Sequence, residues 1–346
     1  MSMQKIVETR KVQRFGKSTL MISLPSEWVK AVDLKPSDLV VLEVKNDGSL
    51  VVVPQKLAEK RTKEKEIKII LSKNTSEELI QRALYTSYIV GYDRIVIEYE
   101  DSSIPPHIMG SIRTMVRMLI GAEIIDQTRN TIIIQNFVDT ERYSIDGLVG
   151  RMTSTIKSML EYLITSIKSG LVDHLKEITE LEFEMDRVHA LAIRYVYALN
   201  MLNTSQFLTE YRVLIKTLED VGDALAQAAQ ILSEKTVLID VVREVVGDKL
   251  EEMKLHLNYT IDMILQAITS QDLSIASRAA DLAAEATKFI SSVEADVIPK
   301  YKSLEDYLKM KSFFEKLMLL CFNLQAAAEV AFDIVMSKKE NVIKLS

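Results

Sequence analysis

The chain of 346 residues carries 48% hydrophobic and 27% charged residues and a formal net charge of −6 at pH 7. Domains usually span about 50 to 200 residues, so this length predicts two or three domains. The composition is that of a globular protein. The negative net charge argues against a chain that binds nucleic acid along its whole length, although residues 1–20 hold five basic side chains against one acidic side chain.

We recognise neither a secretory signal nor a membrane span. The opening residues MSMQKIVETRKVQRF lack the apolar core and small-residue cleavage site of a signal peptide. A membrane-spanning helix needs about 20 mostly apolar residues. Apolar runs near the C-terminus are interrupted before that length by Lys316, Asn323, Gln325, Glu329 and Asp333. We therefore expect a cytoplasmic protein with no membrane insertion.

Residues 1–56 predict a small all-β domain with one short helix. The β-branched runs LMISLP, DLVVLEV and SLVVVP are bounded by turn signals, and the residues NDGS at 46–49 predict a hairpin turn. The helix is expected to begin at Pro25 and Ser26 and to carry Trp28. A segment of this size buries too little surface to be stable alone, so we expect it to dimerise. The charged stretch QKLAEKRTKEKE that follows is expected to be a linker.

Residues 66–140 predict a small α/β domain with the element order βαβαββ. Its strands are expected at IKIILS, RIVIEY, AEIIDQ and TIIIQN, and its helices are expected after Ser76 and after Pro105. We find no phosphate-binding glycine loop and no catalytic motif in it. A spacer or a dimerisation unit is the favoured interpretation.

Residues 144–340 predict an all-α domain, because hydrophobic residues there recur with the 3.6-residue helical period. Six helical stretches with short loops favour antiparallel packing, arranged as two three-helix repeats offset by about 99 residues. The stretches are expected at 144–169, 172–200, 206–233, 240–269, 272–300 and 304–337.

Two acidic pairs mark the second and third of these stretches. Glu182 and Asp186 lie four residues apart, as do Glu219 and Asp223, with Gly222 inside the second pair. Residues at this spacing share one helix face, where like charges are destabilising without a cation between them. A solvent-exposed acidic face is the common explanation of one such pair. Two pairs on adjacent helices, each bordering the apolar stripe, favour a site for a hard or borderline cation such as Mg²⁺, Ca²⁺, Mn²⁺ or iron.

The second repeat keeps only half of these carboxylates. The offset places Asp281 and Glu285 at the positions of the first pair, but Met318 and Phe322 at those of the second. We therefore expect a second metal cluster there to be weak or absent. A redox di-iron centre would require Glu-x-x-His pairs on facing helices. The chain offers a single Asp186-x-x-His189, which argues against redox catalysis.

The stretch LEDVGDALAQAA resembles the pattern L-E-R-I-G-D-H-A of the PhoU family of phosphate-uptake regulators, and ELEFEMDRV resembles the companion helix. The resemblance spans about 144–338 and implies tandem three-helix bundles. In that family the acidic motifs bind multinuclear clusters of iron or zinc, and the protein restrains uptake together with a phosphate ABC transporter. By position this implies metal ligands at Glu182, Asp186, Glu219 and Asp223.

Residues 8–54 resemble the AbrB/SpoVT family of swapped-hairpin DNA-binding domains, through the glycine turn after a basic strand, SLPSEW, LKPSD and a closing hairpin. In that family two chains interlock into one barrel. Glycine is usual at the place of Ser37, a small departure. The resemblance implies DNA contacts from the first strand and its turn, here by Arg10, Lys11, Arg14 and Lys17. A fusion of AbrB-like and PhoU-like parts is typical of archaeal regulators.

Together these features predict a homodimeric, non-enzymatic transcriptional regulator of phosphate uptake that binds DNA and senses metal, phosphate status or a transporter partner. Two alternatives stay open. The protein would act directly on a phosphate ABC transporter or signalling partner if its barrel served only for dimerisation. It would be a carboxylate metalloenzyme if the acidic cluster bound a redox metal and supported turnover.

Overall fold

The computed structural model describes residues 7–44, 48–62, 64–101, 103–201, 207–247, 249–301 and 303–338. The chain divides into two compact units, Met1–Glu64 and Lys65–Ser346. Each unit is described by itself below.

The first unit is built from two antiparallel hairpins. Strands β1 (Gln13–Phe15) and β2 (Thr19–Met21) form one two-stranded sheet, and β3 (Val40–Val44) and β4 (Leu50–Pro54) form another. Gly16, with φ 68°, permits the tight turn of the first hairpin. In the second, Asn46 and Asp47 of the predicted turn lie outside the described residues. The small strand-rich N-terminal region is confirmed, whereas the interlocked barrel stays a prediction.

Two short helices complete this unit. Helix α1 (Ser26–Ala31) follows Pro25, as the sequence predicts. Helix α2 (Gln55–Thr62) replaces most of the predicted linker, because Lys, Glu, Gln, Leu and Ala are all good helix formers. Ser37 has φ 77°, a left-handed conformation that favours glycine. This conformation agrees with the glycine that is usual at the place of Ser37 in the AbrB/SpoVT family.

The second unit begins with the predicted βαβαββ order. Its elements are β5 (Glu66–Leu71), α3 (Glu77–Ile89), β6 (Arg94–Tyr99), α4 (Pro106–Met118), β7 (Ala122–Gln127) and β8 (Thr131–Asn136). The strand order is β5-β6-β8-β7, and only β5 and β6 pair in parallel. Alternate residues of β6 and β8 are buried in one core with residues of α3 and α4. The other alternate residues of β5 and β6 include the cross-strand ion pairs Lys68–Glu98 and Glu66–Arg94.

The rest of this unit is helical. After a 3-10 turn (Thr140–Arg142), the helices are α5 (Ile145–Ser169), α6 (Asp173–Met201), α7 (Leu208–Glu234), α8 (Val237–Val246), α9 (Lys249–Ser270), α10 (Leu273–Val297) and α11 (Leu304–Ser337), with a second 3-10 turn (Ile298–Lys300) before α11. The prediction of one helix at 240–269 was wrong, because the chain forms α8 and α9 there. Helix α8 ends at Val246, immediately before Gly247, whose low helix propensity favours a break.

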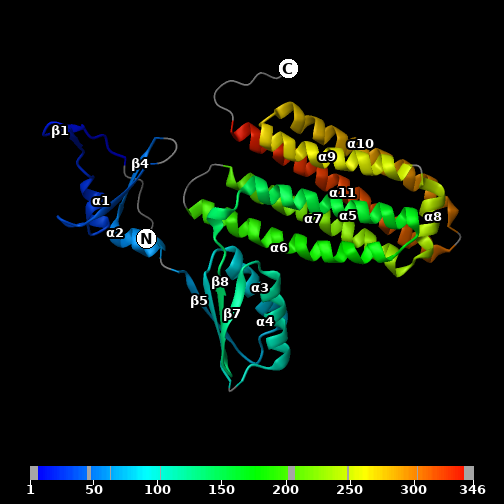
Figure 1. Ribbon diagram of the computed structural model, residues 1–346, viewed down its shortest axis with the longest axis horizontal. Helices are drawn as coiled ribbons and strands as arrows, with labels where there is room; N and C mark the ends of the chain where they lie inside the picture. The colour runs from blue at the N-terminus through cyan, green and yellow to red at the C-terminus, as the bar shows by residue number, and fades with distance from the viewer. Residues whose placement is uncertain are drawn as a thin grey trace. The chain divides into compact units, whose positions relative to one another are not determined.

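The long helices run alongside one another (Figure 1). Helices α5, α6 and α7 pack mutually, as do α9, α10 and α11, and the two groups meet where α7 packs against α11 and α5 against α9. This arrangement agrees with the predicted three-helix repeats. Among the described helices, α11 alone is long and apolar enough to cross a membrane by length and composition. Its buried side chains, including Phe313, Phe314 and Leu317, belong to the core of the bundle.

Candidate functional site

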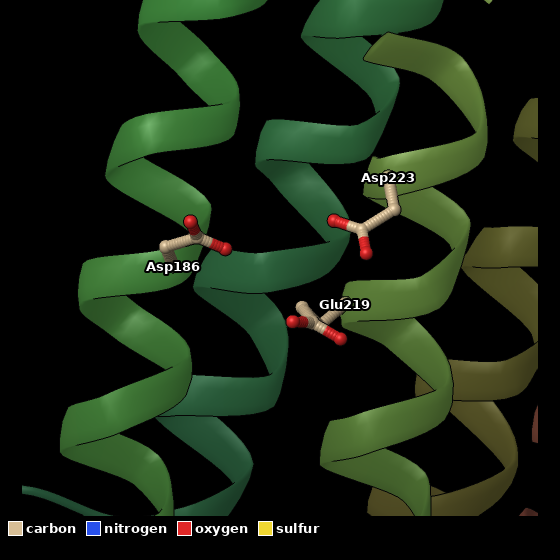
Figure 2. A group of neighbouring side chains, drawn as sticks. All are labelled: Asp186, Glu219 and Asp223. Atoms are coloured by element: carbon tan, nitrogen blue, oxygen red, sulfur yellow. The ribbon is translucent and has the colours of Figure 1, made fainter. Parts of the chain in front are cut away.

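Three of the four predicted ligand carboxylates come together between two helices. Asp186 on α6 faces Glu219 and Asp223 on α7 (Figure 2). One carboxylate oxygen from each residue lies within 4.8 Å of the others, and all three side chains are partly buried. We call Asp186, Glu219 and Asp223 the carboxylate cluster. Its all-oxygen donor set fits a hard or borderline cation, so the cluster could hold a metal ion.

Glu182 lies one helical turn before Asp186 and outside the group of three. It is still close enough to take part in the electrostatics of the cluster. Burial raises the pKa of Glu182, and the charges of Asp223 and Glu219 raise it further. Glu182 is therefore placed at the margin of the cluster, where a larger or multinuclear centre would reach it.

The carboxylate cluster carries more negative than positive charge, since Lys216 pairs with Glu219 alone among its three members. Burial raises the pKa of Asp186 to about 7, with further contributions from Glu219, Asp223 and Glu182. Burial and the charge of Glu219 also raise the pKa of Asp223. Such shifts indicate carboxylates that are partly buried and close to one another, and a bound cation would oppose both effects.

The pH dependence of stability should reveal the raised pKa of Asp186. A carboxyl whose pKa is higher in the folded state favours folding at pH values below its unfolded pKa, and this advantage is lost as the pH rises through the folded pKa. In metal-free protein, Asp186→Asn should be as stable as the wild type near pH 3.8, the ordinary pKa of an aspartate carboxyl. Above pH 7 the variant should be the more stable of the two. Allowing for solvent screening, we expect a gain of about 1–2 kcal/mol. Urea unfolding across this pH range tests this, and a pH-independent difference would contradict it.

Gly222 lies next to methionine side chains of the neighbouring helices α5 and α6. A Cβ at this position would lie 3.4 Å from Cγ of Met185, 3.6 Å from its Cε and 4.0 Å from Sδ of Met159. The first of these is an ordinary contact distance. The glycine therefore lies against the apolar core between α5, α6 and α7, where the methyl group of an alanine would also fit.

Gly222→Ala should for this reason stabilise the protein. Alanine is favoured over glycine in a helix interior by about 1 kcal/mol, and the added methyl group meets only flexible methionine side chains. Urea unfolding followed by circular dichroism should show this gain, and metal affinity should stay unchanged. Gly150→Ala on α5 is a matched control, since its Cβ would lie 3.8 Å from Cδ2 of Leu265. A loss of metal affinity in Gly222→Ala alone would restore a role for the glycine at the cluster.

Sequence reasoning missed Tyr85, which reaches the neighbourhood of the cluster from α3 of the α/β region. Its hydroxyl lies 3.1 Å from Nδ1 of His189. Burial raises the pKa of Tyr85 to about 12, with contributions from Glu219 and Asp186, and burial lowers the pKa of His189 to about 4. His189 is thus a neutral partner of Tyr85 and lies outside the carboxylate cluster. Asp186 and His189 therefore do not converge on one site.

Arg194 is a second residue that sequence reasoning missed. Its side chain, 5% exposed, donates hydrogen bonds from Nη1 to the carbonyls of Tyr88 (2.7 Å) and Tyr92 (3.0 Å) and from Nη2 to Oδ1 of Asp93 (3.0 Å). Ala190, one turn earlier on α6, belongs to the α/β core. Helix α6 therefore joins the carboxylate cluster to the α/β region. The sequence signal for a buried, paired arginine was its place as the single charged residue within the apolar run LAIRYVYAL.

The second repeat does not reproduce the cluster within the described residues. Asp281 and Glu285 lie exposed on α10, and Glu285 is 3.7 Å from Nη1 of Arg278. Phe322 is 55% exposed on α11, and Met318 packs against the bundle core. Phe322 and Met318 therefore add no carboxylate ligands to Asp281 and Glu285.

The basic side chains predicted to contact DNA lie on the first hairpin and the segment before it. Arg14 is in β1, Lys17 is in the turn, and Arg10 and Lys11 precede the strand. All four residues are exposed, and Arg10 forms an ion pair with Glu8.

Comparisons with known proteins define two parts of the chain. Residues 13–60 match the family model "Antidote-toxin recognition MazE, bacterial antitoxin", and residues 149–232 match the PhoU domain model. The chain thus carries a MazE/AbrB-like segment followed by a PhoU domain, which confirms both resemblances over these ranges. These families are regulatory rather than enzymatic.

The other comparisons add less. No curated protein matches the chain. Among solved structures, the crystal structure of PhoU from Pseudomonas aeruginosa is similar with a TM-score of 0.46 and 10% sequence identity, over 56% of this chain and 95% of that chain. The PhoU domain match covers α5, α6 and α7 up to Leu232, the helices that carry and support the carboxylate cluster.

Proposed function

We propose that the protein is a homodimeric, cytoplasmic, DNA-binding regulator of phosphate uptake. The observation that carries the proposal is the joining, in one chain, of a MazE/AbrB-like segment with an exposed basic strand to a PhoU domain with a carboxylate cluster. The first part suggests DNA binding and the second suggests control of phosphate homeostasis. We propose that the protein acts by binding, because PhoU-type and antitoxin-like domains belong to regulatory families.

A second copy of the chain is the proposed partner of the first unit. Within the described residues of that unit, Val53 is the one fully buried large hydrophobic side chain. Many others are exposed, among them Leu20 (69%), Leu42 (59%) and Val44 (76%). An apolar surface of this kind on so small a unit indicates a missing partner. A swapped dimer would cover it and would double the basic surface offered to DNA.

Asp186, Glu219 and Asp223 would hold the metal, with Glu182 as a further ligand of a multinuclear centre. The resemblance to the PhoU family implies iron or zinc, while Mg²⁺, Ca²⁺ and Mn²⁺ also suit the oxygen donors. A bound cation supplies positive charge between α6 and α7. The ligand residues would hold that charge between α6 and α7, and α6 also contacts the α/β region through the pair His189 and Tyr85.

We propose a three-domain division at 1–56, 66–140 and 144–340, in which the α/β domain couples the other two. The PhoU-like domain would respond to metal, to phosphate status, or to a phosphate ABC transporter or signalling partner. Coupling of this kind requires a difference in binding free energy between two states. Helix α3 contacts α6 through Tyr85 and His189, and this contact would connect the α/β domain with the helix that carries Asp186.

Chromatin immunoprecipitation from cells grown with high and with low phosphate tests the proposal. We expect promoters of phosphate-uptake genes to be enriched in a phosphate-dependent way. A chain carrying Ala in place of Arg10, Lys11, Arg14 and Lys17 serves as the matched control. Absence of enrichment at every such promoter under both conditions would overturn the role in transcription.

A further inference from the structure

The carboxylate cluster has one ionic partner of its own within the described residues, the ammonium group of Lys216. Lys216 forms short ion pairs with Glu219 and with Asp220, three and four residues ahead on α7. Neither Asp186 nor Asp223 has an ion-pair partner in the described part of the chain. A single lysine therefore supplies the nearest compensating charge at the cluster.

The two ion-pair partners of Lys216, Glu219 and Asp220, differ in whether they belong to the cluster and in how exposed they are. Glu219 belongs to the cluster and its side chain is 15% exposed. Asp220 points outside the cluster and its side chain is 41% exposed. The Lys216 side chain is itself 53% exposed, so its ammonium group lies at the solvent-facing edge of the site.

A metal ion in the cluster would compete directly with Lys216. Ligation takes up the oxygens of Glu219 and places positive charge close to the ammonium group, and like charges at such distances repel. Asp220 can keep the ammonium group when Glu219 releases it.

We propose that Lys216 is a built-in, displaceable counter-cation that offsets part of the negative charge of the cluster without metal and moves to Asp220 alone when metal binds. This inference rests on the proposed metal site. It gives Lys216 the role of setting the affinity, because every bound ion must first displace the ammonium group from Glu219. It also gives Asp220 a role as the position to which Lys216 withdraws.

Calorimetric titration of the full-length, metal-free protein with Mn²⁺ tests the inference. Lys216→Met removes the competing charge and keeps most of the side-chain volume, so Mn²⁺ should bind about tenfold more tightly. Asp220→Asn removes the withdrawal position, so Mn²⁺ should bind several-fold more weakly than to wild type. Lys176→Met is the matched control. It removes an i, i+3 ion pair of 2.8 Å with Asp173 on α6, away from the cluster, and should leave the affinity unchanged.

The possible failures are distinguishable. If wild type binds Mn²⁺, Asp186→Asn does not, and Lys216→Met binds no more tightly than wild type, the role of Lys216 is wrong while the metal site stands. If wild type binds neither Mn²⁺ nor Zn²⁺, both the site and the inference are overturned. Thermal unfolding of each variant without metal, with unchanged midpoints, shows that an altered affinity does not come from a damaged fold.

Discussion

Replacing Arg10, Lys11, Arg14 and Lys17 together by alanine is expected to abolish DNA binding at physiological salt while leaving the protein dimeric. These side chains are exposed on or next to the first hairpin, and the proposed two-fold dimer would present each of them twice. Contacts of Lys and Arg with phosphate release counterions, so the logarithm of the affinity falls linearly with the logarithm of the salt concentration, with a slope of about −0.9 per contact. Loss of eight contacts should reduce that slope by about 7 and the affinity by about a thousandfold or more.

Fluorescence anisotropy with a DNA duplex at several salt concentrations measures both quantities, and light scattering measures the mass of the dimer. A control chain with four alanines on the helical bundle has the same change in net charge. Suitable exposed basic residues for it are Lys168, Lys176, Arg278 and Lys288. If the hairpin variant bound DNA as tightly as this control, the first unit would serve only for dimerisation, and direct action on a transporter or signalling partner would become the better proposal.

The order of the elements could be predicted because it depends on local patterns. Alternating β-branched residues define β5, β6, β7 and β8, and Ser76 and Ser144 cap α3 and α5 through their hydroxyls, as the sequence leads one to expect. The break between α8 and α9 was missed because apolar residues continue the helical period on both sides of Gly247. A single glycine is a weak signal against such a long periodic segment.

The geometry of the carboxylate cluster depends on contacts between helices, which a single sequence does not show. The spacing places Asp186 on one face of α6, but the register between α6 and α7 decides that it meets Glu219 and Asp223 while Glu182 lies outside the group. The same limit applies to Gly222, whose neighbour Met185 lies on another helix. Tyr85 comes from a region separated from α6 by about a hundred residues, so no local motif connects it to His189.

Asp93→Ala is expected to destabilise the second unit. Arg194 is 5% exposed, and Asp93 is its only carboxylate partner among the described residues. The carbonyls of Tyr88 and Tyr92 would still accept its hydrogen bonds, and the guanidinium lies 5.0 Å from the centre of the Tyr88 ring. Removal of one member of a buried ion pair costs about 3–5 kcal/mol, because the other charge stays buried. Since Asp93 is 36% exposed, we expect a loss of about 2–3 kcal/mol.

Asp262→Ala is the matched control for this prediction. Its carboxylate lies 2.6 Å from Nζ of Lys157, a shorter distance than in the buried pair, but the Asp262 side chain is 56% exposed. An exposed pair contributes about 0–1 kcal/mol, so burial rather than distance should decide the outcome. Far-ultraviolet circular dichroism during urea unfolding reports on the helices of the second unit, whereas the only tryptophan, Trp28, reports on the first. Equal losses in the two variants would contradict the structural importance of Arg194.

A double-mutant cycle with Arg194→Met separates the ion pair from the other contacts of Asp93, whose Oδ2 also accepts a hydrogen bond from the amide of Lys65. Arg194→Met removes the buried charge, so adding Asp93→Ala to it should cost about 1–3 kcal/mol less than Asp93→Ala alone. Because α6 carries Arg194 two turns after Asp186, the same variants also test the coupling of the α/β region to the cluster. We expect Asp93→Ala to change the Mn²⁺ affinity if that coupling operates through α6, and an unchanged affinity would restrict this ion pair to a structural role.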